Sequence, residues 1–159
     1  MKTYHLTLSQ KFPASHPKAG KHTFFRDKLH AAITGNADYW NKLHTIRANY
    51  DFWAKRFKKI AAGEACLSVR EWIGKPYGKG STQHEIARLT REDGIGLQQF
   101  RFVVGANNQR VVVIENASQP SIRVLAMNDG LSTEDWNDWF RGSSCSKPMA
   151  IIHFTKFRY

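Results

Sequence analysis

The stretch NKLHTIR, residues 41–47, decides how the rest of the chain is interpreted. It places a lysine, a histidine, a threonine and an arginine close together, and its β-branched residues favour a strand. Side chains alternate between the two faces of a strand. Thr45 and Arg47 are therefore expected on one face, and Lys42 joins them only if it lies at the strand entrance or in a bulge. Alone, the stretch predicts a basic strand and no more.

The segments before and after this stretch alternate between strand and helix patterns. Upstream, the periodicity predicts a strand over 3–10, a loop with Pro and Gly over 11–22, and a helix over 23–35 that ends at a glycine. Downstream, it predicts a helix of modest propensity over 51–63 and a strand over 64–72. The stretch is thus expected to lie between two helices.

The second half of the chain adds strand patterns, a capped helix and an apolar closing strand. These elements are a Gly/Pro-rich loop over 73–85, strands over 85–92, 97–104 and 109–116, a short element over 121–130, a helix over 132–142 and a strand over 148–159. Ser132 with Asp135 forms a capping-box pattern ahead of Trp136 and Trp139, which we expect in the core. Many short strands with two or three helices predict an α+β fold with a partly closed β-barrel, in one domain over 1–159.

Composition limits the class of protein. Of the 159 residues, 42% are hydrophobic, which is enough for one core. No apolar run approaches the roughly 18 residues that span a bilayer, and the first residues lack the unbroken apolar segment of a signal peptide. Cys66 and Cys145 are far apart in sequence and have no metal-type spacing. We therefore expect two thiols in a reducing cytoplasm, with no metal or other cofactor.

Positive charge is concentrated in the first third of the chain. The formal net charge is +11, and residues 1–60 hold 12 Lys and Arg against 3 Asp and Glu. A concentrated positive field attracts polyanions, of which nucleic acid is the commonest inside cells. The alternative is a solvated basic face that only aids solubility. A membrane-surface role is disfavoured because no long basic amphipathic helix is expected.

Taken in order, these features resemble the ASCH family of PUA-like domains. An opening strand precedes a helix, and K-x-x-T-I-R follows as Lys42 to Arg47. A glycine then introduces the strand AAGEACLSVREW, the pair Asp129-Gly130 precedes the capped helix, and MAIIHFTKFRY closes the chain. The resemblance covers nearly the whole chain, with an enlarged segment over about 73–123. It implies a small β-barrel flanked by helices, with a cleft that takes RNA or a modified nucleoside.

Some members of this family hydrolyse the amide of N4-acetylcytidine with a lysine, a threonine and an acid. The resemblance places these roles on Lys42, Thr45 and Asp129, although the amidohydrolases have a glutamate where this chain has the shorter Asp129. Amide hydrolysis needs a nucleophile, a base and a proton donor for the departing nitrogen. Thr45 is the expected nucleophile, and Lys42 is the expected base if burial or Arg47 depresses its pKa. Arg47 is expected to bind phosphate or an oxyanion.

Each of these residues also has a simpler interpretation. Thr45 is an ordinary strand former, Lys42 an ordinary solvated charge, and Arg47 an ordinary surface ion pair. His44 is a candidate for substrate binding, but its position also suits a half-buried strand residue. Asp129 also suits a turn that favours the start of the next helix.

A second candidate contact lies in the loop WIGKPYGKG, residues 72–80. Trp72 and Tyr77 bracket Lys75 and Lys79, and aromatic faces stack bases while lysines neutralise phosphates. We therefore expect this loop to contact single-stranded RNA or an unstacked base. The alternative is that Trp72 fills the core and Tyr77 packs the turn.

The sequence thus predicts a basic protein that binds RNA or a modified nucleoside over residues 42–47. Hydrolysis of N4-acetylcytidine is its enzymatic form, and a non-catalytic RNA or modified-base reader is the alternative. A nuclease is disfavoured because no metal-binding carboxylate cluster or paired-histidine site stands out. No membrane contact is expected, and the oligomeric state is left open.

Overall fold

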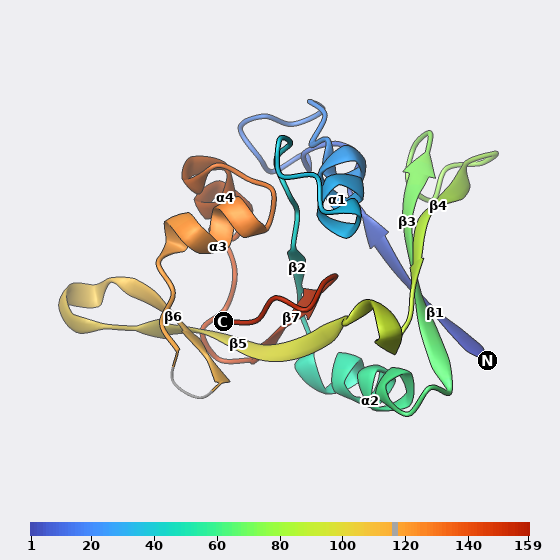
Figure 1. The fold of residues 1–159 in the computed structure, drawn as a ribbon. Helices are drawn as coiled ribbons and strands as arrows, with labels where there is room; N and C mark the ends of the chain where they lie inside the picture. Colours follow the sequence, from blue (N-terminus) through green and yellow to red (C-terminus); the bar gives the residue numbers. More distant parts are fainter. Residues whose placement is uncertain (116–117) are drawn as a thin grey trace.

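The structure, a computed structural model, describes residues 1–115 and 118–159 (Figure 1). Four α-helices are present in these residues: α1 (Phe25–Thr34), α2 (Tyr50–Ala61), α3 (Ile122–Asn128) and α4 (Thr133–Trp139). The strands are β1 (Lys2–Leu8), β2 (His44–Arg47), β3 (Ala65–Ile73), β4 (Thr82–Leu89), β5 (Gly96–Val104), β6 (Arg110–Ile114) and β7 (Met149–His153). The strand predicted over 109–116 is β6, and its predicted end at 116 lies outside the described residues.

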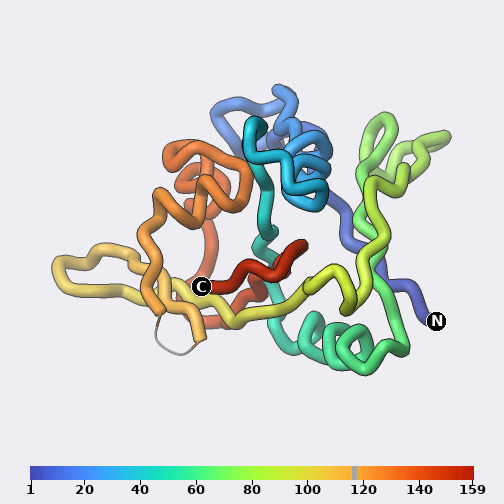
Figure 2. Tube along the Cα trace, viewed as in Figure 1, coloured from blue at the N-terminus to red at the C-terminus, as the bar shows by residue number. Residues whose placement is uncertain are grey.

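The strands form two sheets. β1, β3 and β4 make a three-stranded sheet in which β1 and β3 are parallel, and β2, β7, β5 and β6 make an antiparallel four-stranded sheet. Figure 2 shows how the chain leaves β4 and continues into β5, which joins one sheet to the other. The predicted α+β class is confirmed. Among the described residues, strand pairing does not close the two sheets into a barrel, so the barrel stays a prediction.

Four helices are present where two or three were predicted, because the short element expected over 121–130 contains α3. The helix ends follow local chemistry. α1 ends at Gly35, whose φ of 69° is in the left-handed region that glycine adopts without strain. At the start of α4, the Ser132 hydroxyl accepts a hydrogen bond from the Asp135 backbone N–H, as the capping pattern predicts. α4 ends at Trp139, before the predicted end at 142.

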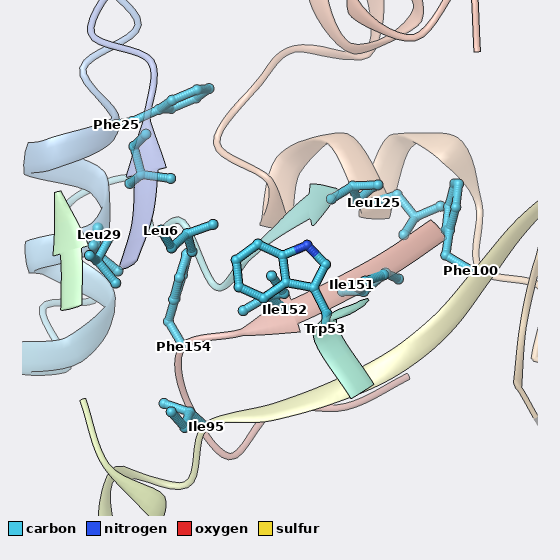
Figure 3. Packing of buried hydrophobic residues seen from close by; sticks show 14 of the residues in the cluster. Leu6, Phe25, Leu29, Trp53, Ile95, Phe100, Leu125, Ile151, Ile152 and Phe154 are labelled. Carbon is cyan, nitrogen blue, oxygen red and sulfur yellow. The ribbon is translucent and has the colours of Figure 1, made fainter. Parts of the chain in front are cut away.

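Both sheets and the four described helices contribute side chains to the core. Figure 3 shows Trp53 pointing from α2 toward Ile151 and Ile152 of β7, with Leu6 of β1 beside them. Residues 150–153 of β7 are buried, which confirms an apolar closing strand, but the strand ends at His153 and not at the predicted 159. Burial of each large apolar side chain contributes roughly 1.5–3 kcal/mol. This packing fixes β2, which pairs with β7 and leads into the candidate site.

The loop between β3 and β4 is shorter than predicted. The two strands pair out to Ile73 and Thr82, so residues 74–81 form the loop in place of 73–85. The segment that the resemblance marks as enlarged, about 73–123, contains β4, β5 and β6. Within residues 1–115 and 118–159, no helix combines the length and the apolar character needed to cross a membrane.

Candidate functional site

Lys42 lies two residues before β2, at the strand entrance, which is one of the two positions predicted to let it join Thr45. The Lys42 backbone N–H donates to the Lys28 carbonyl of α1 at 2.9 Å, and the Leu43 N–H donates to the Asn128 carbonyl of α3 at 2.7 Å. The entrance is therefore held between two helices. Because Lys42 is outside the regular strand, strand alternation does not direct its side chain away from Thr45.

The Lys42 side chain forms a buried ion pair with Asp129. Its Nζ lies 2.6 Å from Asp129 Oδ1 and 2.5 Å from the Asp129 carbonyl oxygen, and it also lies 4.0 Å from the centroid of the Phe25 ring. Lys42 is 1% exposed and Asp129 is 3% exposed. Lys42 is thus no ordinary solvated charge, and both members of the pair depend on each other for a partner.

Burial shifts both members of this pair toward their neutral forms. Desolvation lowers the pKa of the Lys42 amine, and the Asp129 carboxylate opposes that shift. Desolvation raises the pKa of the Asp129 carboxyl, and the Lys42 ammonium opposes it. Both directions make proton transfer between the two groups easier than in water. A neutral Lys42 amine is the form that accepts a proton from a nucleophile.

The turn that carries Asp129 has a glycine for a steric reason. Gly130 has a φ of 79°, and a Cβ at this position would lie 3.2 Å from Lys28 Cδ and 3.4 Å from Lys42 Cβ. The missing side chain therefore allows both lysines to approach the turn. The Lys28 ammonium donates to the Gly130 carbonyl at 2.8 Å and to the Thr23 carbonyl at 3.1 Å.

Thr45 and Arg47 line the same cavity as Lys42 and Asp129. The other lining residues are Ser9, Phe25, Ile46, Leu131, Trp139 and Phe140. The volume open to the centre of a water-sized sphere is about 10 Å³, which is room for about one water molecule. Thr45 and Arg47 share this cavity as expected, but Ile46 between them also lines it, so strand alternation alone does not account for the lining.

Arg47 is held by backbone carbonyls. Its Nη2 donates to the Thr7 carbonyl at 2.6 Å and its Nη1 to the Ile46 carbonyl at 3.4 Å. Burial lowers the pKa of the Arg47 guanidinium, and Asp129 opposes that shift. Among the residues that the structure describes, Arg47 forms no ion pair. Of its two interpretations, the surface ion pair is therefore not found.

His44 does not line the cavity, although the sequence makes it a candidate for substrate binding. It is fully buried, and its Nε2 lies 2.7 Å from the Tyr159 hydroxyl. The Asn128 amide donates to that hydroxyl at 3.0 Å, which leaves the Tyr159 O–H to donate to His44. The proton of neutral His44 then resides on Nδ1, which faces Asp129 Oδ1 at 4.0 Å.

The environment of His44 keeps it neutral. Burial, with His153 and Lys42 nearby, lowers the pKa of His44 well below its usual value. His44 therefore lies next to the Lys42–Asp129 pair, outside the cavity, and stays uncharged. Sequence reasoning did not find Tyr159 as its partner, because the two residues are 115 positions apart and no local pattern connects them.

The structure does not bring the loop of 74–81 to this cavity. Trp72 is half-buried and Tyr77 is 90% exposed, with their ring centroids 5.0 Å apart. Lys75 and Lys79 are exposed. None of these four residues lines the cavity. The two rings contact each other away from the cavity, and the two lysines are exposed nearby in the sequence.

Several residues of the site could not be predicted from the sequence. Trp136 is fully buried as predicted, but Trp139, also predicted in the core, is half-buried and lines the cavity. Lys28 lies between the site and Trp40, with its Nζ 4.2 Å from the centroid of the Trp40 ring. Burial, with the charge of Lys42, lowers the pKa of Lys28 to about 8. Helical spacing alone could not separate Trp139 from Trp136.

Neither a metal cluster nor a relative defines the site. Within residues 1–115 and 118–159, no group of three or more His, Cys, Asp or Glu side chains could hold a metal ion. Both cysteines are free thiols, Cys66 buried and Cys145 exposed. Comparisons of the chain with protein-family models, curated proteins and solved structures find no match. The function is therefore inferred from the residues of the cavity.

Proposed function

We propose that this chain is an ASCH-type, PUA-like protein that takes a modified cytidine, free or within RNA, and hydrolyses its N4-acyl amide. The same proposal includes a partly closed barrel and a cytoplasmic location. One observation carries it: the Lys42 amine, the Thr45 hydroxyl, the Arg47 guanidinium and the Asp129 carboxyl line one cavity. A base, a nucleophile, an oxyanion partner and an acid are the groups that amide hydrolysis needs.

The reaction starts with transfer of the Thr45 hydroxyl proton to the neutral Lys42 amine. The Thr45 oxygen attacks the acyl carbon, and the Arg47 guanidinium stabilises the resulting oxyanion. The C–N bond then breaks as the amino nitrogen of cytidine takes a proton from Lys42 or Asp129. The proton that Lys42 accepted passes to that nitrogen, directly or through Asp129, so the Lys42 amine is neutral again. Water then attacks the acyl-Thr45 ester as Lys42 takes one of its protons, the ester C–O bond breaks, and the Thr45 oxygen takes that proton back as the carboxylic acid leaves.

The shorter acid of this chain still reaches the base. Asp129 stands where the amidohydrolases of the family have a glutamate, and its Oδ1 lies 2.6 Å from Lys42 Nζ. The loss of one methylene therefore does not separate the carboxyl from the amine. Asp129 reaches less far toward the substrate than a glutamate would. Lys42 compensates by carrying the proton between Asp129 and the substrate.

The cavity has to widen before a substrate enters. Room for about one water molecule is less than a nucleobase occupies. Trp139 is half-buried and forms part of the wall, so its side chain is the group whose movement opens the cavity. Exclusion of water by the closed wall strengthens the electrostatic interactions inside.

The test is incubation of the protein with N4-acetylcytidine, followed by chromatography for cytidine. The wild type is expected to produce cytidine, Thr45→Ala to lose at least about 10³-fold in rate, and Thr45→Ser to retain part of it. Thr3→Ala, which removes a half-buried strand hydroxyl outside the cavity, serves as the matched control. Absence of turnover by the wild type sinks the enzymatic proposal for this substrate.

A non-catalytic reader is the second candidate, and the contacts of the Lys42 amine favour it. The two hydrogen bonds of Lys42 Nζ to Asp129 hold the base in place in the closed form. A reader binds N4-acetylcytidine, measured by titration calorimetry, without forming cytidine. Binding lost in Arg47→Gln together with zero turnover supports the reader over the hydrolase.

A further inference from the structure

Helix α2 carries a basic face that the cavity does not use. Lys55, Arg56 and Lys59 follow Phe52 at positions i+3, i+4 and i+7, which places all four on one side of a helix. Lys58 flanks this side, and all of them are exposed except Arg56, which is half-buried. The opposite side of α2 is committed to the core through Trp53, Phe57 and Ile60.

Strand β1 extends the basic face. The Arg56 guanidinium carbon lies 3.7 Å from the centroid of the Phe52 ring and 5.1 Å from that of the Tyr4 ring. Lys2 Nζ lies 5.3 Å from the same Tyr4 ring. We call this set the α2 basic face: Lys2, Tyr4, Phe52, Lys55, Arg56, Lys58 and Lys59.

The cations of the α2 basic face have no acidic partners. Among the residues that the structure describes, ion pairs form at lysines and arginines elsewhere, but none involves Lys2, Lys55, Arg56, Lys58 or Lys59. Asp51 and Glu64 lie near the two ends of α2, are exposed, and form no ion pair with this face. The five charges are therefore available to an external polyanion.

We propose that the α2 basic face binds the phosphate backbone of single-stranded RNA, so that the protein takes its modified cytidine within an RNA strand. Lys55 and Lys59 lie about one helical turn apart, roughly 6 Å along the axis, and neutralise phosphates. The exposed Phe52 ring with the Arg56 guanidinium against it offers a platform for an unpaired base. The choice of RNA rests on the proposed function, whereas the surface is separate from the cavity.

A lipid surface fits this face less well. Helices that lie on membranes bury an apolar side in the lipid, and the apolar side of α2 is already packed in the core. Phe52, 44% exposed, is the one large apolar side chain that α2 presents. A single ring suits stacking on a base better than insertion of a helix.

The experiment measures binding of a fluorescein-labelled oligouridylate of about 12 nucleotides by anisotropy over about 50–200 mM salt. Lys55→Gln/Lys59→Gln is expected to weaken binding about tenfold and to reduce the slope of log K against log salt by about 1.4, since each single-strand contact contributes about 0.7. The control Lys21→Gln/Lys156→Gln removes the same charge from exposed lysines outside the face and is expected to change the slope little.

The outcomes separate this inference from the proposed hydrolysis. Equal loss in the two double variants means a diffuse charge effect and overturns the inference. Binding to phosphatidylserine vesicles, or to oligothymidylate, with no binding to the RNA also overturns it. A loss of RNA binding in Lys55→Gln/Lys59→Gln alone, with unchanged hydrolysis of free N4-acetylcytidine, supports the inference. If the protein binds RNA through α2 but does not hydrolyse N4-acetylcytidine, the catalytic proposal is wrong and the inference about α2 is still supported.

Discussion

The cavity at Lys42 and the loop between β3 and β4 both carry cations and aromatic rings, but their physical states differ. At the cavity, Lys42 is 1% exposed and its amine contacts a carboxylate, a carbonyl and the Phe25 ring. In the loop, Tyr77 is 90% exposed and its ring meets only that of Trp72 among the aromatic contacts of the described residues. Residue type alone does not distinguish the two regions. The two regions differ because the Lys42 side chain is buried and has fixed partners, whereas the lysines and the tyrosine of the loop are exposed.

The largest expected effect comes from breaking the buried pair. Lys42→Met leaves the Asp129 carboxyl buried without its partner and is expected to lower the free energy of unfolding by about 3–5 kcal/mol. Lys75→Met, in the exposed loop, is expected to change it by less than about 0.5 kcal/mol. Urea denaturation measures both.

A double variant shows whether the pair is the cause. Lys42→Met/Asp129→Asn removes both charges and is expected to recover part of the loss. A similar, small loss for Lys42→Met and Lys75→Met would remove the distinction between the two regions.

The next largest effect is a decrease in the free energy of unfolding as the pH falls. Burial lowers the pKa of His153 to about 3 and that of His44 well below its usual 6.5. Below pH 6.5 the unfolded chain therefore binds protons that the folded chain does not, so stability falls as the pH falls. Each histidine is expected to cost about 1 kcal/mol at pH 5.5 relative to pH 7.5.

A substitution at His153 isolates its share of this decline. Neither ring nitrogen of His153 has a hydrogen-bond partner among the described residues. His153→Leu is expected to raise stability at pH 7.5 by about 1 kcal/mol and to remove about half of the acid decline. Urea denaturation at the two pH values measures this, and an unchanged decline in the variant would contradict the assignment.

An effect smaller than the combined acid decline of the two histidines is expected at the contact of His44 with Tyr159. Tyr159→Phe removes the hydroxyl that donates to His44 Nε2, and the expected cost is about 1 kcal/mol of stability. Nitrogen-15 NMR of the histidine side chains should show Nδ1–H in the wild type and a loss of that tautomer in the variant. In the proposed arrangement the Asn128 amide donates to the Tyr159 hydroxyl, and that hydroxyl donates to His44. A wild-type His44 with its proton on Nε2 would contradict this arrangement.

The smallest effect is expected in the exposed loop. Tyr77→Ser should leave hydrolysis of free N4-acetylcytidine within about twofold and stability within about 0.5 kcal/mol, because Tyr77 does not line the cavity. Chromatography and urea denaturation measure the two quantities. A strong loss of turnover would mean that the loop reaches the substrate.

The sequence predicts those parts of the fold that depend on local periodicity. The strand at 3–10, the helix stopped by Gly35 and the apolar closing strand all follow from neighbouring residues. It also predicts that Lys42 can join Thr45 only from the strand entrance or through a bulge, and the structure has the entrance. The sheet arrangement depends on pairings such as β1 with β3, whose partners are about sixty positions apart and have no local signal.

The rest of the site depends on contacts between distant segments. His44 was a candidate ligand because of its neighbours, but Tyr159 at the far end of the chain accounts for its contacts. Trp139 shares its helical spacing with Trp136, and packing against Phe12 and Phe25 places it at the cavity wall. Such packing is set by tertiary structure and not by the sequence around each residue.

The proposed hydrolysis requires Lys42, Thr45 and Asp129 to work together on an acyl group. The most direct test is mass spectrometry of peptides from the protein after a rapid acid quench of its reaction with N4-acetylcytidine. The account predicts an acetyl group on the peptide that contains Thr45, and none in Thr45→Ala. Formation of cytidine without acetylation of Thr45 in any quenched sample would contradict it.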